Sequence, residues 1–324
     1  MPDPRLGWIP FAVLAGLRWA PEADVVVSAN PPTSAHVAAA VVAGITRRPW
    51  VADFHDPWSL PSYQPWRGRW RPAVDRRLER AVLRRADRVV ATTRWLAGYL
   101  AGRGAQDRVR VVPNGYEPAE HPCEVPPDDD FTVLHAGAFY GPRSPEPLLE
   151  AVAKALEAEP AMRTSLRLRL RDWQDARNAA RLEAATRSLG LEDVVERVPP
   201  VPRRDALAAM RRAAVLVLVT DPVEGGRGLI PIKLFEYLGA GRPILALAPP
   251  DGEAGRLVRQ AGGLVADPSD AAGAAGALIR LYRSWRSGED GYRPNPEVVE
   301  AHRWDRLAGL LARVLDEASA MGGG

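Results

Sequence analysis

A lysine and a glutamate three residues apart, just behind a glycine-rich stretch, are the side chains of this sequence with the clearest chemical potential. The stretch runs from Gly225 to Ile230, and Lys233 and Glu236 follow it. Residues three apart share one face of a helix. A lysine offers a cation to a phosphate, and a glutamate accepts hydrogen bonds from two ribose hydroxyls. One short helix could therefore hold both ends of a nucleoside diphosphate.

The segments around these residues predict the elements that must position them. An apolar run at 213–220 is typical of a buried parallel strand, and a second strand is expected at 243–247, behind a helix that Gly241 and Pro243 would end. This order aims unpaired backbone N–H groups and the positive end of a helix dipole at one point, where a phosphate is favoured. A glycine-rich turn in an ordinary strand–helix–strand crossover is the alternative.

A second candidate phosphate site follows a predicted strand at 131–136. Gly137 would let a ligand approach the backbone, and Arg143, at the start of the next predicted helix, could hydrogen-bond two phosphate oxygens. An exposed arginine near a helix start is the alternative.

His55 and Asp56 directly follow a third predicted strand, at 49–54. The carboxyl ends of strands are where an α/β sheet presents ligand-binding groups. A hydrogen-bonded His–Asp pair within a loop is the alternative. The other histidines have no comparable context, so the sequence assigns them no role.

The segment from Pro231 to Pro243 has the pattern Pro-x-Lys-Leu-Phe-Glu-Tyr-x-x-x-Gly-x-Pro. It resembles the donor-binding segment of family 4 glycosyltransferases, which are retaining enzymes of the GT-B fold. The resemblance implies an α/β protein of two Rossmann-like parallel-sheet domains with the active site in the cleft between them. It also implies transfer of a sugar from a nucleoside diphosphate sugar to a hydroxyl of a glycan, lipid-linked or small-molecule acceptor.

The resemblance further implies roles for single residues. Glu236 would contact the ribose, and the segment 198–201, ending at Val201, would contact the base edge. His55 would line the sugar and acceptor side, with Asp56 orienting its loop. The residues that would meet the diphosphate are Gly137, Arg143, Gly228, Leu229, Ile230 and Lys233.

Two positions depart from the family pattern. Gly228 stands where many members have a glutamate against the donor sugar, and Ala138 stands where an arginine is common. The usual first strand, with its glycine-rich turn, is not found ahead of the predicted strand at 24–28, so we expect an incomplete first domain. These departures support a second hypothesis, a catalytically weak or inactive nucleotide-sugar-binding partner subunit. A sugar-nucleotide epimerase is a third, but its acid and base carboxylates cannot be placed.

Strands that alternate with helices predict a doubly wound parallel sheet in each half. We expect the first domain at 1–117, a linker rich in proline and acid at 118–130, and a nucleotide-sugar-binding domain at 131–300. By resemblance, a terminal helix at 301–318 packs back toward the first domain.

The linker contains Asp128, Asp129 and Asp130, an Asp-x-Asp pattern that can hold a divalent metal in a different glycosyltransferase fold. No buried strand end lies beside it, so we interpret it as a solvated turn. We expect no metal and no other cofactor, because helix dipoles, Lys233 and Arg143 could neutralise the leaving diphosphate.

Composition limits the class of protein. A chain of 324 residues with 46% hydrophobic content can bury a sizeable core. No apolar run approaches bilayer length, and the start lacks a signal-peptide pattern. The single cysteine, Cys123, excludes an internal disulfide framework and a cysteine-based zinc cluster. We therefore expect a cytoplasmic protein.

The net charge is only +3, but nine arginines lie between Arg67 and Arg88, with Trp58, Trp66 and Trp70 nearby. The segment 58–88 could make a peripheral membrane contact or receive an acidic acceptor. A solvated helix face is the alternative. No recognition motif accompanies the charge, so nucleic acid is not an expected partner.

Overall fold

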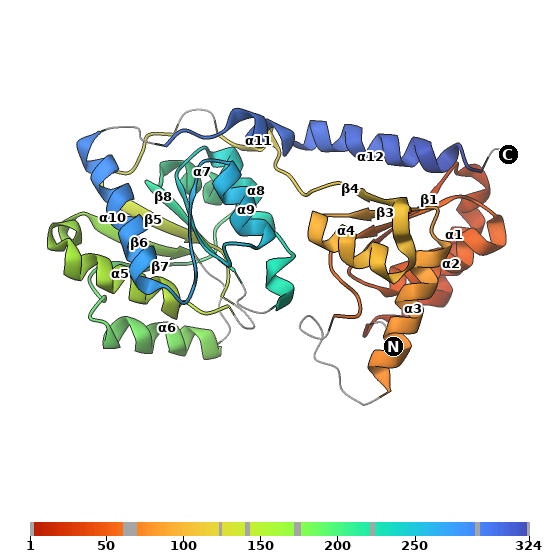
Figure 1. The fold of residues 1–324 in the computed structure, drawn as a ribbon, viewed down its shortest axis with the longest axis horizontal. Helices are drawn as coiled ribbons and strands as arrows, with labels where there is room; N and C mark the ends of the chain where they lie inside the picture. The colour runs from red at the N-terminus through yellow and green to blue at the C-terminus, as the bar shows by residue number, and fades with distance from the viewer. Residues whose placement is uncertain are drawn as a thin grey trace. The chain divides into compact units, whose positions relative to one another are not determined.

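The computed structural model of the chain contains two compact units, each built on a parallel β-sheet with helices packed against it (Figure 1). It describes residues 3–60, 70–122, 125–139, 143–171, 176–220, 224–288 and 292–322. The first unit comprises Met1–Asn114 and Asp305–Gly324, and the second comprises Gly115–Trp304. The predicted α/β class, with a parallel sheet in each half, is confirmed.

The sheet of the first unit runs in the order β1-β2-β3-β4. Its strands are β1 (Val26–Asn30), β2 (Trp50–Phe54), β3 (Arg88–Ala91) and β4 (Val109–Val111). The helices of this unit are α1 (Ile9–Trp19), α2 (Ser34–Thr46), α3 (Arg71–Arg85) and α4 (Arg94–Leu100), and the last helix, α12 (Trp304–Ser319), joins them. The Thr93 hydroxyl accepts a hydrogen bond from the Leu96 N–H (3.1 Å), a side-chain cap that explains where α4 begins.

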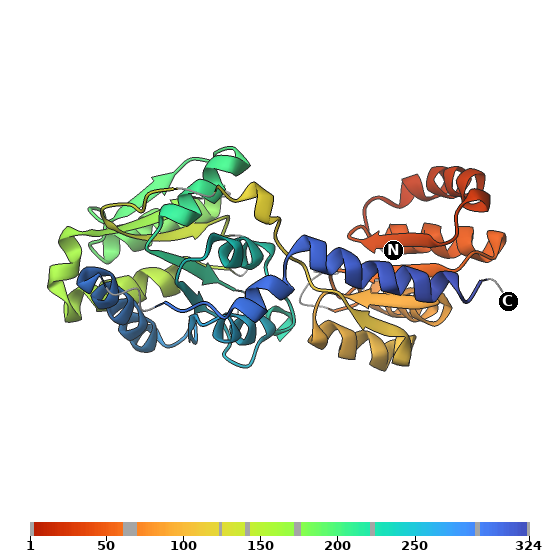
Figure 2. The ribbon, with the colours of Figure 1, turned by 90° about the horizontal axis from the view of Figure 1, so that it is seen from above.

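Helix α12 packs on the sheet of the first unit, along which it lies in Figure 2. Val314 and Ala318 are buried against Val51 of β2 and Val90 of β3. Glu317 receives hydrogen bonds from Arg88 and Arg110, each at 2.9 Å. Apolar burial and paired charges therefore both hold this helix, the last described element, to strands from the start of the chain.

The sheet of the second unit runs in the order β10-β9-β8-β5-β6-β7. Its strands are β5 (Phe131–Ala136), β6 (Leu166–Arg171), β7 (Val195–Val198), β8 (Val215–Val219), β9 (Ile244–Leu247) and β10 (Leu264–Ala266). The helices are α5 (Glu146–Ala158), α6 (Ala176–Ser188), α7 (Arg203–Arg212), α8 (Ile232–Ala240), α9 (Glu253–Gln260), α10 (Ala271–Ser287) and α11 (Pro296–Ala301).

Strands β5 and β8 are the neighbours at which the chain reverses its direction across this sheet. From β5 the chain moves outward through β6 and β7, and from β8 it moves the other way through β9 and β10. Every residue of β5 and β8 is buried, because both faces of the sheet are covered. Such a switch point, at the carboxyl ends of the strands, is where open α/β sheets bind ligands.

The segment expected to be a linker, 118–130, lies in the second unit. Pro118–Glu120 forms a 3-10 turn, and the side chain of His121 behind it is buried. Asp128 accepts a hydrogen bond from Arg169 Nη1 (2.5 Å), and its other oxygen lies 3.8 Å from Arg212 Nε. The expectation of a solvated turn is therefore wrong for Asp128, because two arginines from neighbouring elements compensate its charge.

Among the helices of the described ranges, none combines the length and the apolar character needed to cross a bilayer.

Candidate functional site

The loop after β5 and the start of α8 meet at the switch point of the second unit. Gly137 follows β5 with a φ of +125°, and a Cβ atom added to it would lie 2.7 Å from Lys233 Nζ. Any side chain here would displace the end of the lysine, and the backbone conformation is one that residues other than glycine rarely adopt. The structure thus brings together two predicted site residues that lie almost a hundred positions apart.

Lys233 is positioned by a histidine that the sequence pattern leaves without a role. Lys233 Nζ lies 3.3 Å from Nε2 of His135, and His135 Nδ1 donates to the carbonyl of Val217 (3.0 Å). Because a carbonyl can only accept, Nδ1 carries the proton and Nε2 is free to accept from the ammonium. The ring is buried and stacks on Phe139, with 4.4 Å between ring centroids.

Burial lowers the pKa of His135 well below its ordinary value, and the charges of Lys233 and Arg143 lower it further. His135 is therefore a neutral hydrogen-bond acceptor at physiological pH. Arg143 is half-buried. It is near enough to His135 for its charge to act on the same imidazole as that of Lys233.

Tyr237 ties α8 to the two strands. Its hydroxyl accepts from the Ala136 N–H (2.9 Å) and donates to the Val217 carbonyl (3.2 Å). The side chain is fully buried between the helix and the sheet. Helix α8 is thus fixed against the carboxyl end of β5 and the middle of β8.

Glu236 is buried on α8 and is held from two sides. Its Oε1 accepts from Arg203 Nη2 (2.6 Å), and its Oε2 lies 3.3 Å from Nε2 of His121. The alignment of the second contact is too poor for a full hydrogen bond, so we treat it as electrostatic. Burial alone would raise the pKa of Glu236, but His121 and Arg203 outweigh it and hold that pKa below its ordinary value. The carboxylate is therefore ionised at neutral pH.

Arg203 begins α7 and also pairs with Glu120, with Nη2 2.6 Å from Oε2. It lies two residues after Val201, which is half-buried. Arg203, which sequence reasoning missed, therefore links the predicted ribose residue Glu236 to the start of α7, just behind the predicted base-edge segment.

The predicted phosphate loop lies between β8 and α8, as expected. Gly228 is buried, and Leu229 and Ile230 are half-buried. A 3-10 turn at Glu224–Arg227 precedes them, and α8 begins at Ile232. Strand, loop, helix and the following strand β9 thus occur in the predicted order.

His55 and Asp56 lie in the first unit, after β2. Nε2 of His55 lies 3.2 Å from Oδ2 of Asp53. This hydrogen bond raises the pKa of His55 despite its partial burial, whereas burial raises the pKa of Asp56 although the charge of His55 opposes it. Within the described residues, the side-chain partner of His55 is therefore Asp53, which pattern reasoning did not single out.

Asn30, at the end of β1, fixes the backbone of this loop. Its Oδ1 accepts from the His55 N–H and its Nδ2 donates to the Asp56 carbonyl, both at 2.9 Å. An Asn at the carboxyl end of the neighbouring strand was the signal that could have identified it.

The segment 58–88 differs in part from its prediction as a membrane contact. Trp58 is fully buried and cannot reach a membrane surface, whereas Trp70 is exposed. Residues 61–69, including Trp66, lie outside the described ranges. Arg71, on α3, lies 3.6 Å from the buried carboxylate of Asp75, so the first arginine of this helix is paired within it.

Within the described ranges, no group of three or more His, Cys, Asp or Glu side chains could hold a metal ion.

Two family models match the chain. A glycosyl transferase 4-like domain matches residues 2–115, and the glycosyl transferases group 1 domain matches residues 130–284. The chain is 32% identical over 201 residues to a D-inositol 3-phosphate glycosyltransferase of Acidothermus cellulolyticus, and 30% identical over 203 residues to one of Streptomyces scabiei. Each match covers 56% of this chain and 44% of the relative, so it spans less than half of those proteins.

Solved structures show the same fold. Sucrose-phosphate synthase from Thermosynechococcus elongatus aligns with a TM-score of 0.71 at 19% identity, covering 98% of this chain and 81% of that one. The Anabaena protein HepE in complex with UDP and glucose aligns with a TM-score of 0.69 at 17% identity, covering 94% and 81%. At these identities the likeness concerns the GT-B fold alone.

Proposed function

Because the chain belongs to the group 1 glycosyltransferases and has a glycosyltransferase 4-like domain, we propose that it transfers a sugar. The sugar moves from a nucleoside diphosphate sugar to an acceptor hydroxyl, with retention at the anomeric carbon. The observation that carries the proposal is the start of α8. There Lys233, held by His135, lies against Gly137, and Glu236 lies one turn further along the same helix.

In this proposal the diphosphate lies against Gly137 and the N–H groups of Gly228, Leu229 and Ile230. Helix N-termini favour anions, and two cations strengthen that preference. In this proposal Lys233 and Arg143, whose charges both act on His135, supply the two cations. Together they would stabilise the charge that grows on the leaving diphosphate, so the proposal requires no metal.

The ribose would lie at Glu236 and the base edge at Val201. The ionised carboxylate of Glu236 is an acceptor for ribose hydroxyls, and Arg203, exposed at the surface, is able to swing aside when they arrive. HepE is described in complex with UDP, so UDP is the first nucleotide to test.

The transfer itself would need no dedicated base. The acceptor oxygen forms a bond to the anomeric carbon as the bond from that carbon to the phosphate oxygen breaks, on the same face of the sugar. The acceptor proton passes to the departing phosphate oxygen. His55, with Asp53 as its partner and Asp56 beside it, would line the sugar and acceptor side.

A second candidate function is a nucleotide-sugar-binding partner subunit with little or no activity. It is favoured by Gly228, because this buried position supplies no carboxylate to the donor sugar. Slow hydrolysis of the matching nucleotide sugar would separate the enzyme from the binding subunit, and an epimeric nucleotide sugar as product would identify an epimerase instead.

The proposal also includes a cytoplasmic location and a peripheral membrane contact through 58–88. Among the described residues of this segment, Trp70 and the exposed arginines of α3 could make that contact. Cell fractionation tests both.

The first experiment is a thermal-shift panel of UDP, GDP, dTDP and ADP, with and without magnesium, on wild type, Glu236→Ala and Glu183→Ala. A ligand that binds only the native state raises its melting temperature, by an amount that corresponds to about 2.7 kcal/mol at a hundredfold excess over Kd. We expect one nucleotide to stabilise wild type and Glu183→Ala without magnesium, and not to stabilise Glu236→Ala. Glu183 is an exposed glutamate of the same unit. A response that Glu236→Ala retains would refute the site.

A further inference from the structure

His121 is a buried histidine beside the proposed ribose site, and the sequence pattern leaves it without a role. Its side chain is 3% exposed, and it lies in the segment before β5, in the same unit as α8. Neither ring nitrogen has a hydrogen-bond partner among the residues that the structure describes. Burying polar atoms without hydrogen bonds costs free energy, so this position needs an explanation beyond packing.

The ring of His121 reaches Glu236 because α8 leaves room for it. Gly239 lies three residues after Glu236 on this helix, and a Cβ atom added to it would lie 2.5 Å from Nε2 of His121. On another side the ring of Tyr116 meets the imidazole edge-on, with 5.6 Å between ring centroids. In this enclosed position Nε2 lies 3.3 Å from Oε2 of Glu236. Because an ionised carboxylate only accepts, we assign a hydrogen to Nε2.

The two oxygens of Glu236 have partners of very different exposure. Oε2 faces the enclosed imidazole, whereas Oε1 accepts from Arg203, whose side chain is 57% exposed. Arg203 also donates from Nε to Glu120 (2.8 Å), which is itself largely exposed. Arg203 is therefore able to leave Glu236 and keep an ionic partner, while His121 stays in place. Oε1 is the oxygen that an arriving ligand is able to reach.

We propose that His121 is a positioning residue of the ribose site, which holds Oε2 of Glu236 so that Oε1 accepts a ribose hydroxyl once Arg203 pairs with Glu120 alone. The inference rests on the proposed function, because it requires a nucleotide at α8. Without His121 the carboxylate would turn both oxygens toward Arg203, since a guanidinium favours bidentate pairing with a carboxylate. The protein's own cation would then compete with the ribose. His121 thereby favours a ribonucleotide over a 2′-deoxyribonucleotide.

The charge of Glu236 depends on the same neighbours. Burial raises the pKa of Glu236, but His121 and Arg203 together lower it by more. Of the other charged groups nearby, Glu120 lies beyond Arg203, and Lys233 lies one turn earlier on α8. An apolar residue in place of His121 should therefore raise the pKa of Glu236 in the free protein, because burial would then be less opposed.

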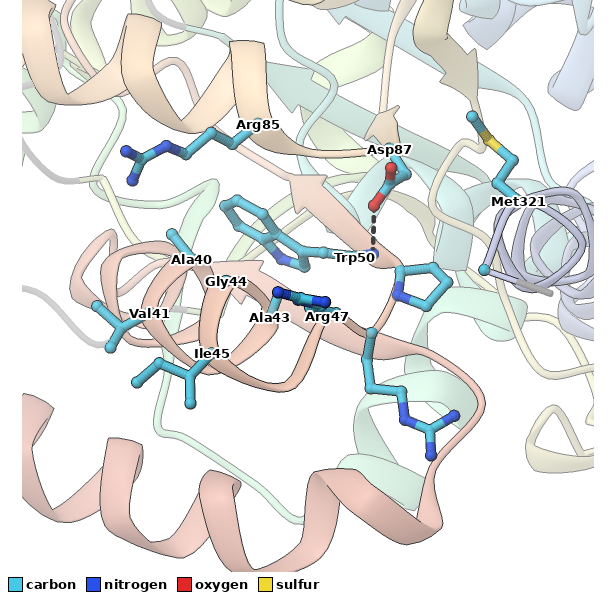
Figure 3. Close-up of a pocket in the computed structure, with 13 residues that line it drawn as sticks. Ala40, Val41, Ala43, Gly44, Ile45, Arg47, Trp50, Arg85, Asp87 and Met321 are labelled. Carbon is cyan, nitrogen blue, oxygen red and sulfur yellow. Dashed lines mark hydrogen bonds between the residues drawn. The ribbon is translucent and has the colours of Figure 1, made fainter. Parts of the chain in front are cut away.

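A second cationic surface of the protein must be distinguished from this site. In the first unit a cavity of about 640 Å³, lined by Arg47, Arg48 and Arg85, lies where α2 ends and β2 begins (Figure 3). Asp87 also lines it, but Oδ2 of Asp87 accepts from the Trp50 N–H (2.8 Å), the dashed line in Figure 3. A nucleotide bound there would be held by its phosphates, so its affinity would not depend on the 2′-hydroxyl. Arg47→Gln is the control for this cavity.

The test measures the Kd values of UDP, GDP and ADP, and of the 2′-deoxy form of each, by isothermal titration calorimetry. For the nucleotide that binds best, wild type should prefer the ribose form about tenfold, because the missing hydroxyl removes a hydrogen bond to a charged group. His121→Leu should raise the Kd of the ribose form about fivefold, a coupling usual for residues in contact, and reduce the preference to about threefold or less. His121→Gln keeps an N–H donor, so its preference should lie between the two.

A measurement without ligand makes the test independent of nucleotide binding. Carbon-13 NMR of glutamate-labelled protein follows the titration of Glu236, whose signal is the one missing from Glu236→Gln. We expect His121→Leu to raise the pKa of Glu236. His302→Leu is the matched control, because His302 also packs on α8, through Phe235, but its Nδ1 donates to the Val298 carbonyl (2.7 Å). This variant and Arg47→Gln should keep the wild-type pKa of Glu236 and the wild-type ribose preference.

The possible outcomes separate this inference from the proposed function. If wild type binds nucleotide and His121→Leu keeps the full ribose preference, the inference is overturned and the proposed function stands. Equal losses for the ribose and 2′-deoxy forms, without rescue by His121→Gln, would show that the ring serves packing alone and would also overturn it. If His121→Leu shifts the pKa of Glu236 but wild type binds no nucleotide, the contact is real and the proposed function fails, and the ribose role of His121 fails with it.

Discussion

Replacing Gly137 with alanine tests whether this glycine makes room for the phosphate-binding lysine. The added Cβ atom would lie 2.7 Å from Lys233 Nζ. Non-bonded atoms of this size need roughly 3.5 Å, so the ammonium must retreat by about 1 Å. The φ of +125° adds strain of about 1–3 kcal/mol to any residue with a side chain.

We expect two separable results from this substitution. The free energy of unfolding of the second unit should fall by about 1–3 kcal/mol, from backbone strain. The Kd for the nucleotide should rise about tenfold, because a charged hydrogen bond to phosphate contributes about 1.5 kcal/mol or more. Chemical denaturation measures the first quantity, and isothermal titration calorimetry measures the second.

Gly190→Ala is the matched control, because Gly190 also has a positive φ, of +62°, but no atom lies within 4 Å of its added Cβ. It should lose about 1–2 kcal/mol of stability and bind nucleotide normally. Wild-type affinity in Gly137→Ala would refute the steric reasoning. Equal losses of affinity in both variants would show that strain, and not the lysine, controls binding.

Two histidine substitutions give further predictions. His135→Phe should raise the nucleotide Kd about tenfold, because it removes the hydrogen-bond acceptor of Lys233. His135→Gln restores an acceptor, so its Kd should lie between those of His135→Phe and wild type. An unchanged Kd of His135→Phe in calorimetry would contradict the positioning role. His36 is buried, its Nδ1 lies 2.8 Å from the Ser28 hydroxyl, and burial lowers its pKa to about 3. Because the unfolded chain then binds more protons than the folded one, the free energy of unfolding should fall by about 1.4 kcal/mol for each pH unit below 6.5. His36→Gln should reduce this dependence of the free energy of unfolding on pH between pH 6.5 and pH 4, as measured by urea denaturation. The same dependence in the variant and in wild type would contradict the prediction.

The elements around α8 were predictable because their signals are local. The apolar run of β8, the glycines after it and the Gly-x-Pro that ends α8 lie within about thirty residues of one another. Lys233 and Glu236 share a helix face by their spacing alone. The order of strands and helices follows from the same kind of periodicity.

The partners of these residues were not predictable, because tertiary packing supplies them. His135 reaches Lys233 across 98 positions, and Arg203 reaches Glu236 across 33. No periodic pattern encodes such contacts. Composition misleads for a similar reason. Asp128 is one of three consecutive aspartates, yet arginines on β6 and α7 meet it, and whether such partners face an acid depends on the fold.

The carbonyl of Val217 accepts two hydrogen bonds, one from His135 and one from Tyr237. This single atom of β8 therefore joins β5, which Gly137 follows, to the helix that carries Lys233. The proposed phosphate cradle is preorganised before any ligand arrives, so binding has little backbone entropy to lose. A packing change around Val217, which is buried and is not itself a predicted site residue, should therefore change the affinity for the diphosphate.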